Sequence, residues 1–314
     1  MPGSSTSYAY NPANGICWSY AGSSSAGCGS PPAGADSYSY DADGNETSNG
    51  NGLTLAYNPL GQMTSATSAG ASTSYSYLGE GQNQLYGIGT SQQLENSLLG
   101  VISQGTGTPA STTYYTRAQN GRLIDERTPS GTYNYLYDGN GDIIALTDSS
   151  GHLVDQYAYD PYGNTTTNIG SVANSFGYHA GYTTSAGLIH YGARYLNPAQ
   201  ASWTQQDPLN HITSLTQTDR YTYAGDNPIN LSDPTGACFV VSCRTYHAVG
   251  NYISRNAEAL GEIGLGVGVA TIGVAATGVC YYFTRGTEPE CAKPAIYGGA
   301  AGGFAIAEGA SRLR

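Results

Sequence analysis

Acidic residues are the first candidates for chemistry in this chain, and the segment 138–142, DGNGD, is a dense group of them. Closely spaced Asp and Asn oxygens suit Ca²⁺, but an EF-hand loop needs Gly at its sixth position and Glu at its twelfth. Ile143 and Ser149 occupy those positions here. Asp followed by Gly and Asn also starts a tight turn. We therefore predict a turn at 138–142 and no calcium site.

Other motifs for catalysis or ligand binding are missing from the sequence. It contains no HExxH, GxSxG or P-loop motif. Gly264, Gly266 and Gly268 match a dinucleotide fingerprint weakly, because no strand of a βαβ unit precedes them. The five histidines lack the spacing of metal ligands. We expect no metal site and no cofactor.

Three Asp-Pro pairs remain, beginning at Asp160, Asp207 and Asp233. Proline restricts the residue before it to an extended backbone, and Asp commonly opens a turn. From the residues alone, all three pairs are best interpreted as turn openers.

The six cysteines fall into three local couples, which are Cys17 with Cys28, Cys238 with Cys243, and Cys280 with Cys291. None has CxxC spacing, so they do not predict a structural metal site. Local disulfides in an exported protein would explain the couples, and scattered thiols are the alternative. The N-terminus lacks the basic and apolar regions of a signal peptide. An exported chain would use another route or belong to a longer product.

The composition favours many short strands joined by tight turns. The chain has 44 Gly, 28 Tyr and only 4 Phe, and charged residues make up 11%. Aromatic and β-branched residues prefer strands, and Gly, Asn, Asp and Ser prefer turns. Residues 1–237 hold 17 acidic and 5 basic residues, against 5 and 6 in 238–314. This acidic body excludes nucleic-acid binding through a basic groove.

A short unit recurs along the body, with Tyr first, Asp or Asn next in most copies, and Gly four residues after the Tyr. It stands at 40–45, 57–62, 137–142 and 159–164, and with one extra residue at 10–15. Of the four copies without the extra residue, three carry a second Tyr two positions earlier, which places two rings on one face of a strand. Each unit therefore predicts the end of a strand and the turn after it. The stretch 133–164 predicts an antiparallel meander with strands at 133–137, 143–147 and 152–159.

These tyrosine-aspartate units resemble the YD repeats of the RHS family, and the stretch after them is more specific. Residues 188–198, LIHYGARYLNP, are similar to the family's GLYYYGARYYDP motif, and 203–209, WTQQDPL, are similar to GRFLSQDPL. Residues 221–236 are similar to YxYxxNNPxNxxDPxG. Order and spacing agree over about 133–237, and weaker repeats extend to about residue 36. The chain is identified as an RHS repeat-associated core protein.

The resemblance implies a mainly β fold, an antiparallel YD-repeat wrap. The family's closed shell is built from many more repeats, so we expect a partial wrap here, followed by a small α-helical, Gly/Ala-rich C-terminal segment. The chain departs from the family at three places. Ala201-Ser202 replaces Gly-Arg, Asn197 replaces Asp, and Ala237 replaces Leu.

The resemblance also implies chemistry. In the family, the end of the core cuts its own chain as an aspartyl protease, just after the DPxGL motif. Mapped here, the carboxylates are Asp207 and Asp233, the motif is Asp233-Pro234-Thr235-Gly236, and the cut lies between Ala237 and Cys238. Two carboxylates brought together would share a proton, one acting as base on a water and the other as acid.

Arg194 is implied as a supporting residue, a charged hydrogen-bond donor that orients a carboxylate. The alternative is a structural bond within the sheet. The departures at Ala201-Ser202 and Ala237 argue for the turn-opener interpretation of both aspartates.

The tail has a different character. Residues 246–262 predict a short helix, and 263–283 are 21 residues without a charge, long enough to span a bilayer. One interpretation is a membrane-interacting segment. The other is a Gly/Ala-rich helical hairpin packed on the body, or a truncated toxin.

We therefore predict three parts, a degenerate YD-repeat β region (1–132), the RHS core (133–237) and a variable C-terminal segment (238–314). The first functional hypothesis is a scaffold that presents or partly encloses a C-terminal effector or toxin-like segment, with self-cleavage after Ala237. Its partners would be secretion machinery and an immunity protein, and its location would be extracellular or the cell surface. The alternative is a non-catalytic adhesive protein, anchored by its C-terminal segment, that binds carbohydrate or another cell-surface ligand.

Overall fold

The computed structural model describes residues 5–79, 82–208 and 219–237, and the backbone of three short strands between 271 and 292. The chain divides into two compact units, Met1–Phe239 and Val240–Arg314. Every side-chain feature below belongs to the first unit.

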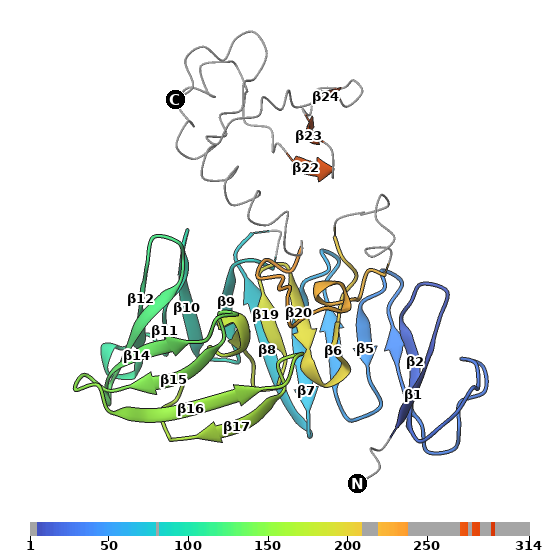
Figure 1. Cartoon of the computed structure of the whole chain (residues 1–314), viewed down its shortest axis with the longest axis horizontal. Coiled ribbons are helices and arrows are strands. Elements are labelled where there is room, and N and C mark those ends of the chain that lie inside the picture. Colours follow the sequence, from blue (N-terminus) through green and yellow to red (C-terminus); the bar gives the residue numbers. More distant parts are fainter. Residues whose placement is uncertain are drawn as a thin grey trace. The chain divides into compact units, whose positions relative to one another are not determined.

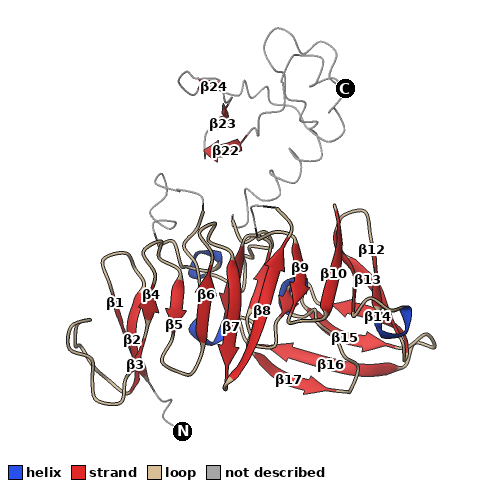
Figure 2. Ribbon diagram, turned by 180° about the vertical axis from the view of Figure 1, so that it is seen from behind, coloured by secondary structure: helices blue, strands red, loops and turns tan. Residues whose placement is uncertain are grey.

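The first unit is built from antiparallel strands in three sheets (Figures 1 and 2). The first sheet consists of β1 (Thr6–Tyr10), β2 (Ile16–Ala21) and β3 (Asp36–Ser37). The large sheet has fourteen strands, each paired with its neighbours in sequence, and β4 and β17 form its ends. Its strands are β4 (Ser39–Tyr40), β5 (Glu46–Ser48), β6 (Thr54–Tyr57), β7 (Met63–Ser68), β8 (Ala71–Tyr77), β9 (Leu85–Ile88), β10 (Gln92–Ser97), β11 (Gly100–Gly105), β12 (Thr113–Arg117), β13 (Leu123–Thr128), β14 (Gly131–Tyr137), β15 (Ile143–Thr147), β16 (Leu153–Tyr159) and β17 (Thr165–Ile169).

The third sheet is small and carries the residues of the candidate site. It consists of β18 (Tyr182–Thr183), β19 (Ile189–Tyr191), β20 (Arg194–Asn197) and β21 (Ser202–Trp203). The helical elements described in this unit are single 3₁₀ turns, at Pro109–Ser111, Tyr178–Ala180, Pro198–Gln200 and Ala224–Asp226. The predicted mainly β, antiparallel fold is confirmed, and β14, β15 and β16 confirm the predicted meander within two residues at each end.

The turns between strands share one hydrogen-bonding pattern. The Oδ1 atom of Asp138 accepts bonds from the backbone N–H groups of Asn140, Gly141 and Asp142, each at 2.9 Å. Such a bond from a side chain to the backbone two residues later starts a turn without help from distant residues. The turn predicted at 138–142 is thus confirmed. Side-chain oxygens accept backbone bonds from residues two and four positions later in the turns that begin at Asn11, Asp41, Asn58, Asp148 and Asp160.

A second repeated interaction involves the tyrosine that precedes a turn. Its hydroxyl donates to the backbone carbonyl of the first residue of the preceding strand. The three examples are Tyr77 to Met63 at 2.9 Å, Tyr137 to Leu123 at 2.9 Å, and Tyr159 to Ile143 at 3.0 Å. Each of these tyrosines also lies at a register shift against the following strand. One tyrosine therefore connects three consecutive strands at a bulge, where the ladder is interrupted.

The main core lies between the large sheet and the segment that carries the third sheet. Met63, Ile143 and Leu146 are fully buried on the large sheet, and Leu188 and Tyr195 pack against the same cluster. In Figure 1, β19 and β20 lie against β6–β8. A second cluster covers the other side of this segment and includes Trp203 and Tyr223. The third sheet is therefore held between two apolar layers, which fixes the position of the candidate site.

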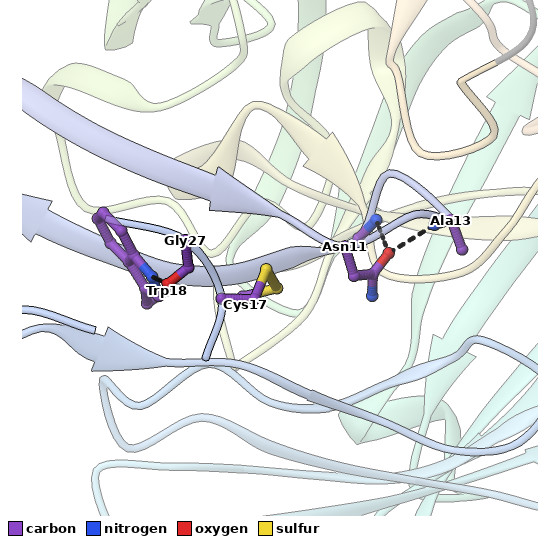
Figure 3. The surroundings of a disulfide bond; sticks show 7 residues. Asn11, Ala13, Cys17, Trp18 and Gly27 are labelled. Atoms are coloured by element: carbon purple, nitrogen blue, oxygen red, sulfur yellow. Dashed lines mark hydrogen bonds between the residues drawn. A yellow bond between two sulfur atoms is a disulfide. The ribbon is translucent and has the colours of Figure 1, made fainter. Parts of the chain in front are cut away.

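A disulfide between Cys17 and Cys28 connects β2 of the N-terminal sheet to the loop that follows it (Figure 3). This pair confirms one of the predicted local couples. The indole Nε1–H of Trp18 donates to the carbonyl of Gly27 at 3.1 Å, which ties the same loop to β2. A disulfide of this kind persists in an oxidising environment.

The described residues of the C-terminal segment form three short antiparallel strands, β22 (Thr271–Ala275), β23 (Gly278–Tyr282) and β24 (Glu290–Ala292). In their register, Cys280 lies opposite Cys291. The helix predicted at 246–262 lies outside the described residues, as do Cys238 and Cys243. Within 263–283 the described residues belong to β22 and β23, and the α-helical character of the C-terminal segment stays a prediction. Among the described residues, no helix has the length and apolar character needed to cross a bilayer.

A buried carboxyl group makes the stability of the large sheet sensitive to pH. Glu126 on β13 is fully buried, and its Oε2 accepts a bond from the Tyr135 hydroxyl at 2.7 Å. Its Oε1 has no hydrogen-bond partner in the described part of the chain. Burial raises the pKa of Glu126 to about 7. Because this pKa lies above that of an unfolded Glu, the carboxyl favours the folded state at low pH and loses that contribution as pH rises through 7.

We predict that replacing Glu126 by Gln (E126Q) flattens this pH dependence. Between pH 4.5 and pH 8, the wild type should lose on the order of 3 kcal/mol of unfolding free energy relative to the variant, because Gln cannot ionise. Urea unfolding at several pH values measures the difference. Glu95→Gln, at an exposed position on β10, is the matched control. Parallel pH profiles for E126Q and the wild type would contradict the prediction.

Candidate functional site

Arg194 is the first residue of β20 and lies beside the turn that links β19 to β20. Gly192 in this turn has a φ of 48°. The backbone N–H of Ala193 donates to the carbonyl of Thr235 at 2.9 Å. The turn of the third sheet is thereby attached to the Asp233-Pro234-Thr235-Gly236 motif, more than 40 positions later in the sequence.

The structure brings the three predicted site residues together. Arg194 is 2% exposed. Its Nη2 lies 2.9 Å from Asp207 Oδ2 and 3.0 Å from Asp233 Oδ2. Both oxygens contact the same nitrogen, so they lie within about 6 Å of each other. A pair of carboxylates this close can cooperate in proton transfer.

The remaining donors of Arg194 hold the backbone around the site. Its Nε donates to the carbonyl of Gly236 at 2.5 Å, and its Nη1 donates to the carbonyl of Arg220 at 3.3 Å. The guanidinium also lies 4.3 Å from the centre of the Trp203 ring. Burial lowers the pKa of Arg194, and the charges of Asp207 and Asp233 raise it again. Arginine remains charged in proteins, so the site holds one cation between two carboxyl groups.

Asp233 is both the start of a turn and part of the charged site. Its side chain is 1% exposed. Its Oδ1 accepts bonds from the Thr235 N–H at 3.3 Å, the Thr235 hydroxyl at 3.0 Å and the Ala237 N–H at 3.3 Å. Bonds of this kind stabilise the ionised carboxylate. The turn-opener interpretation of Asp233 is therefore confirmed, and it does not exclude a chemical role.

Asp207 is the more accessible carboxylate, since its side chain is 15% exposed. Its backbone N–H donates to the carbonyl of Arg220 at 2.9 Å, and the Arg220 Nη2 donates back to the Asp207 carbonyl at 2.5 Å. Sequence reasoning missed Arg220. The signal present in the sequence is the scarcity of basic residues, because Arg220 is one of only five Lys and Arg residues before position 238.

Gly236 is required by the close packing of the motif. Its φ is 64°, in the left-handed region. A Cβ atom there would lie 2.1 Å from the carbonyl oxygen of Tyr191 and 2.8 Å from the backbone nitrogen of Arg194. Ala237 follows directly and is the last described residue before the predicted cut, while Cys238 lies outside the described residues.

The structure explains how two departures from the family pattern are accommodated. Asn197 accepts a bond from the Ala199 N–H at 3.2 Å and caps the 3₁₀ turn 198–200, a task that Asp would also perform. Ala201, which occupies the usual Gly position, has a φ of 58°. Alanine tolerates this left-handed conformation at a cost of about 1 kcal/mol.

No group of three or more His, Cys, Asp or Glu residues in the described part of the chain is arranged to bind a metal. The buried His190 bonds through Nε2 to the carbonyl of Gln82 at 2.9 Å, and burial lowers its pKa to about 4. This histidine serves the packing of β19 against the large sheet.

Comparison with known proteins agrees with the repeat pattern and the fold. The Teneurin YD-shell family model matches residues 32–229, more than half of the chain. The chain belongs to the Teneurin YD-shell family. It is an RHS/YD-repeat protein, as the resemblance in the sequence implied, and the strands described above are those of a YD shell.

Curated relatives of this YD-shell chain include large bacterial proteins. The tRNA3(Ser)-specific nuclease WapA of Bacillus spizizenii is 31% identical over 213 residues, which are 64% of this chain and 9% of that protein. The tRNA nuclease WapA of Bacillus subtilis is 32% identical over the same length and shares. The toxin subunit YenC1 of Yersinia entomophaga is 32% identical over 94 residues, 28% of this chain and 9% of that protein. The chain thus spans about a tenth of the length of these relatives.

Solved structures of TcdB2-TccC3 are also similar to this YD-shell chain. One crystal structure has a TM-score of 0.47 and 19% identity, over 63% of this chain and 11% of that one. A second, without the hypervariable C-terminal region, has a TM-score of 0.47 and 16% identity, over 74% of this chain and 15% of that one.

We predict that Gly236→Ala destabilises the first unit by about 2 kcal/mol or more, because the added Cβ meets backbone atoms and the φ is unfavourable. Gly139→Ala is the matched control, since no heavy atom lies within 4 Å of a Cβ placed there. Thermal unfolding of both variants measures the difference. Equal melting temperatures for the two variants would show that the motif is not packed as described.

Proposed function

We propose that this YD-shell chain is a scaffold for the variable C-terminal segment 238–314, and that it releases the segment by cutting its own chain after Ala237. The three-part division into 1–132, 133–237 and 238–314 belongs to this proposal. The observation that carries it is the contact of one buried guanidinium with two carboxylates and with the carbonyl of Gly236. Gly236, which directly precedes Ala237, is therefore held by the same group as the proposed catalytic pair.

The proposed reaction is hydrolysis of the peptide bond between Ala237 and Cys238. One carboxylate of the pair takes a proton from a water molecule, whose oxygen attacks the Ala237 carbonyl carbon. The other carboxyl group donates a proton to the Cys238 nitrogen as the carbon–nitrogen bond breaks. The products are a chain ending in the Ala237 carboxylate and a segment beginning with the Cys238 amine.

Arg194 has a positioning role in this proposal. Its charge permits two carboxyl groups to lie close together in a buried place. Its bond to Gly236, with that from Ala237 N–H to Asp233, fixes the backbone that leads into the scissile bond. Positioning of this kind favours reaction of one bond over its neighbours.

The relatives named as a toxin subunit and as tRNA nucleases support a toxin-like role for the C-terminal segment. On this proposal the partners are secretion machinery and an immunity protein. The disulfide between Cys17 and Cys28 supports a secreted or cell-surface location. Membrane contact through 263–283 is a further part of the proposal, and flotation of the full chain with liposomes tests it.

A second candidate function is that of a non-catalytic structural or adhesive scaffold at the cell surface. The observation that favours it is that both carboxylates form ion pairs with Arg194, an arrangement that also serves as a buried structural link. The two candidates differ in whether the intact chain is cut.

We predict that the purified full chain yields a product ending at Ala237, and that Asp207→Asn and Asp233→Asn each slow its formation by at least about 100-fold, because Asn cannot transfer a proton. Intact-mass spectrometry over time measures the product. Asp160→Asn is the matched control, since it changes an Asp-Pro pair remote from Arg194 and its turn can form with an Asn oxygen.

Circular dichroism of each variant shows whether the β fold is retained. Cleavage of folded D233N at the rate of the wild type would refute the catalytic role of the pair. A folded wild type that stays intact under all conditions would establish the second candidate in place of the first.

A further inference from the structure

A cavity of about 560 Å³ lies between the hairpin of β1 and β2 and the residues 200–202 and 219–226. None of the residues proposed to take part in cleavage lines it. Its walls come from β1 and β2, from β4, from the turn after β16, and from 200–202 and 219–226. These segments are far apart in sequence and belong to one compact unit. The cavity is therefore formed by the fold as a whole.

Tyrosine rings dominate the lining. They are Tyr8, Tyr10, Tyr40, Tyr162 and Tyr221. The rings of Tyr40 and Tyr221 pack at 5.5 Å between centroids, and the Tyr221 hydroxyl donates to the carbonyl of Gly44 at 2.6 Å. Part of this aromatic wall is thus held in place before any ligand arrives.

The cavity also carries negative charge. Asp219 and Asp226 line it, and none of the described lining residues is Lys, Arg or His. Burial, and then the charge of Asp219, raise the pKa of Asp226. The pKa of Tyr10 is raised by burial and by the charges of Tyr8, Asp219 and Asp226. Both carboxylates line the same cavity as the tyrosine rings, and a positive charge there would relieve the repulsion between them.

Gln200 ties the lining of the cavity to β5. The Nε2 of Gln200 donates to Glu46 Oε1 at 3.0 Å. The Oε1 of Gln200 is buried and accepts no hydrogen bond from the described part of the chain. Because this oxygen is enclosed by the protein, the ligand-facing groups of the lining are the tyrosine rings and the two carboxylates.

We propose that this cavity binds an organic cation, the guanidinium group of an arginine side chain on a peptide or protein partner. A guanidinium stacks on aromatic faces and donates several hydrogen bonds to carboxylates. The lining supplies aromatic faces and two carboxylates. In the described part of the chain, no group of three His, Cys, Asp or Glu residues is arranged to hold a metal ion. The inference goes beyond the proposed scaffold function and does not depend on self-cleavage.

Titration calorimetry of the full chain at low salt tests the proposal with N-acetyl-arginine amide as probe and its neutral isostere N-acetyl-citrulline amide as control. The arginine probe should bind at least about fivefold more tightly than the citrulline probe, and added salt should weaken its binding. Asp226→Asn and Tyr10→Ala should each weaken it by about threefold or more. Both positions are exposed, so these variants should fold.

Asp138→Asn removes an exposed carboxylate that does not line the cavity, and it should leave binding unchanged. Equal affinity for the arginine and citrulline probes would overturn the proposal, and so would an equal loss in D138N and D226N. The disaccharide N,N′-diacetylchitobiose provides a neutral sugar arm. Binding of this sugar without binding of the arginine probe would assign the cavity to carbohydrate and overturn the proposal.

Discussion

The hydrogen bond from a tyrosine hydroxyl to the first carbonyl of the preceding strand is the interaction on which the rest of this fold depends. At each bulge the regular ladder is interrupted, and a buried carbonyl without a partner would cost about 1–3 kcal/mol. The ring of Tyr77, Tyr137 or Tyr159 fills the apolar layer while its hydroxyl satisfies that carbonyl. Phenylalanine could fill the same space but could not donate the bond. At these three positions the fold therefore requires Tyr and not Phe.

The sheet supports the site through its core. Tyr195 of the third sheet bonds through its hydroxyl to that of Tyr77 at 2.6 Å, and Gln82 bonds to the carbonyl of Ala193 at 2.9 Å. These contacts bind the turn beside Arg194 to the large sheet. A buried arginine with two carboxylates carries a substantial desolvation cost. The fold offsets this cost with the carbonyls of Gly236 and Arg220 and with the face of Trp203.

Local chemistry made much of the fold predictable. Asp138 and its equivalents start turns through bonds to residues two to four positions away, so a sequence window of six residues contains the whole interaction. The meander at 133–159 followed from the same units. Glu126 was not predicted, because no motif around it indicates that β13 buries a carboxyl group beside Tyr135 of β14. Asp207, Asp233 and Arg194 came from the resemblance, since no periodicity relates residues that are 13 to 39 positions apart. The roles of Arg220 and Trp203, and the tyrosine-lined cavity, could not be predicted in the same way. They depend on contacts between segments that are distant in sequence, which a short stretch of sequence does not reveal.

The coupling of three strands by one tyrosine constrains how a chain of this kind can change in length. Tyr137 and Tyr159 both make this bond and are 22 residues apart, so the repeating unit is a hairpin. One residue added inside a strand would turn every following side chain to the opposite face and move the next ring out of the core. A whole hairpin added or removed keeps every ring on its carbonyl. Viable length variants of the body should therefore differ in steps of about twenty residues. The spacing of these tyrosines fixes the length of each step.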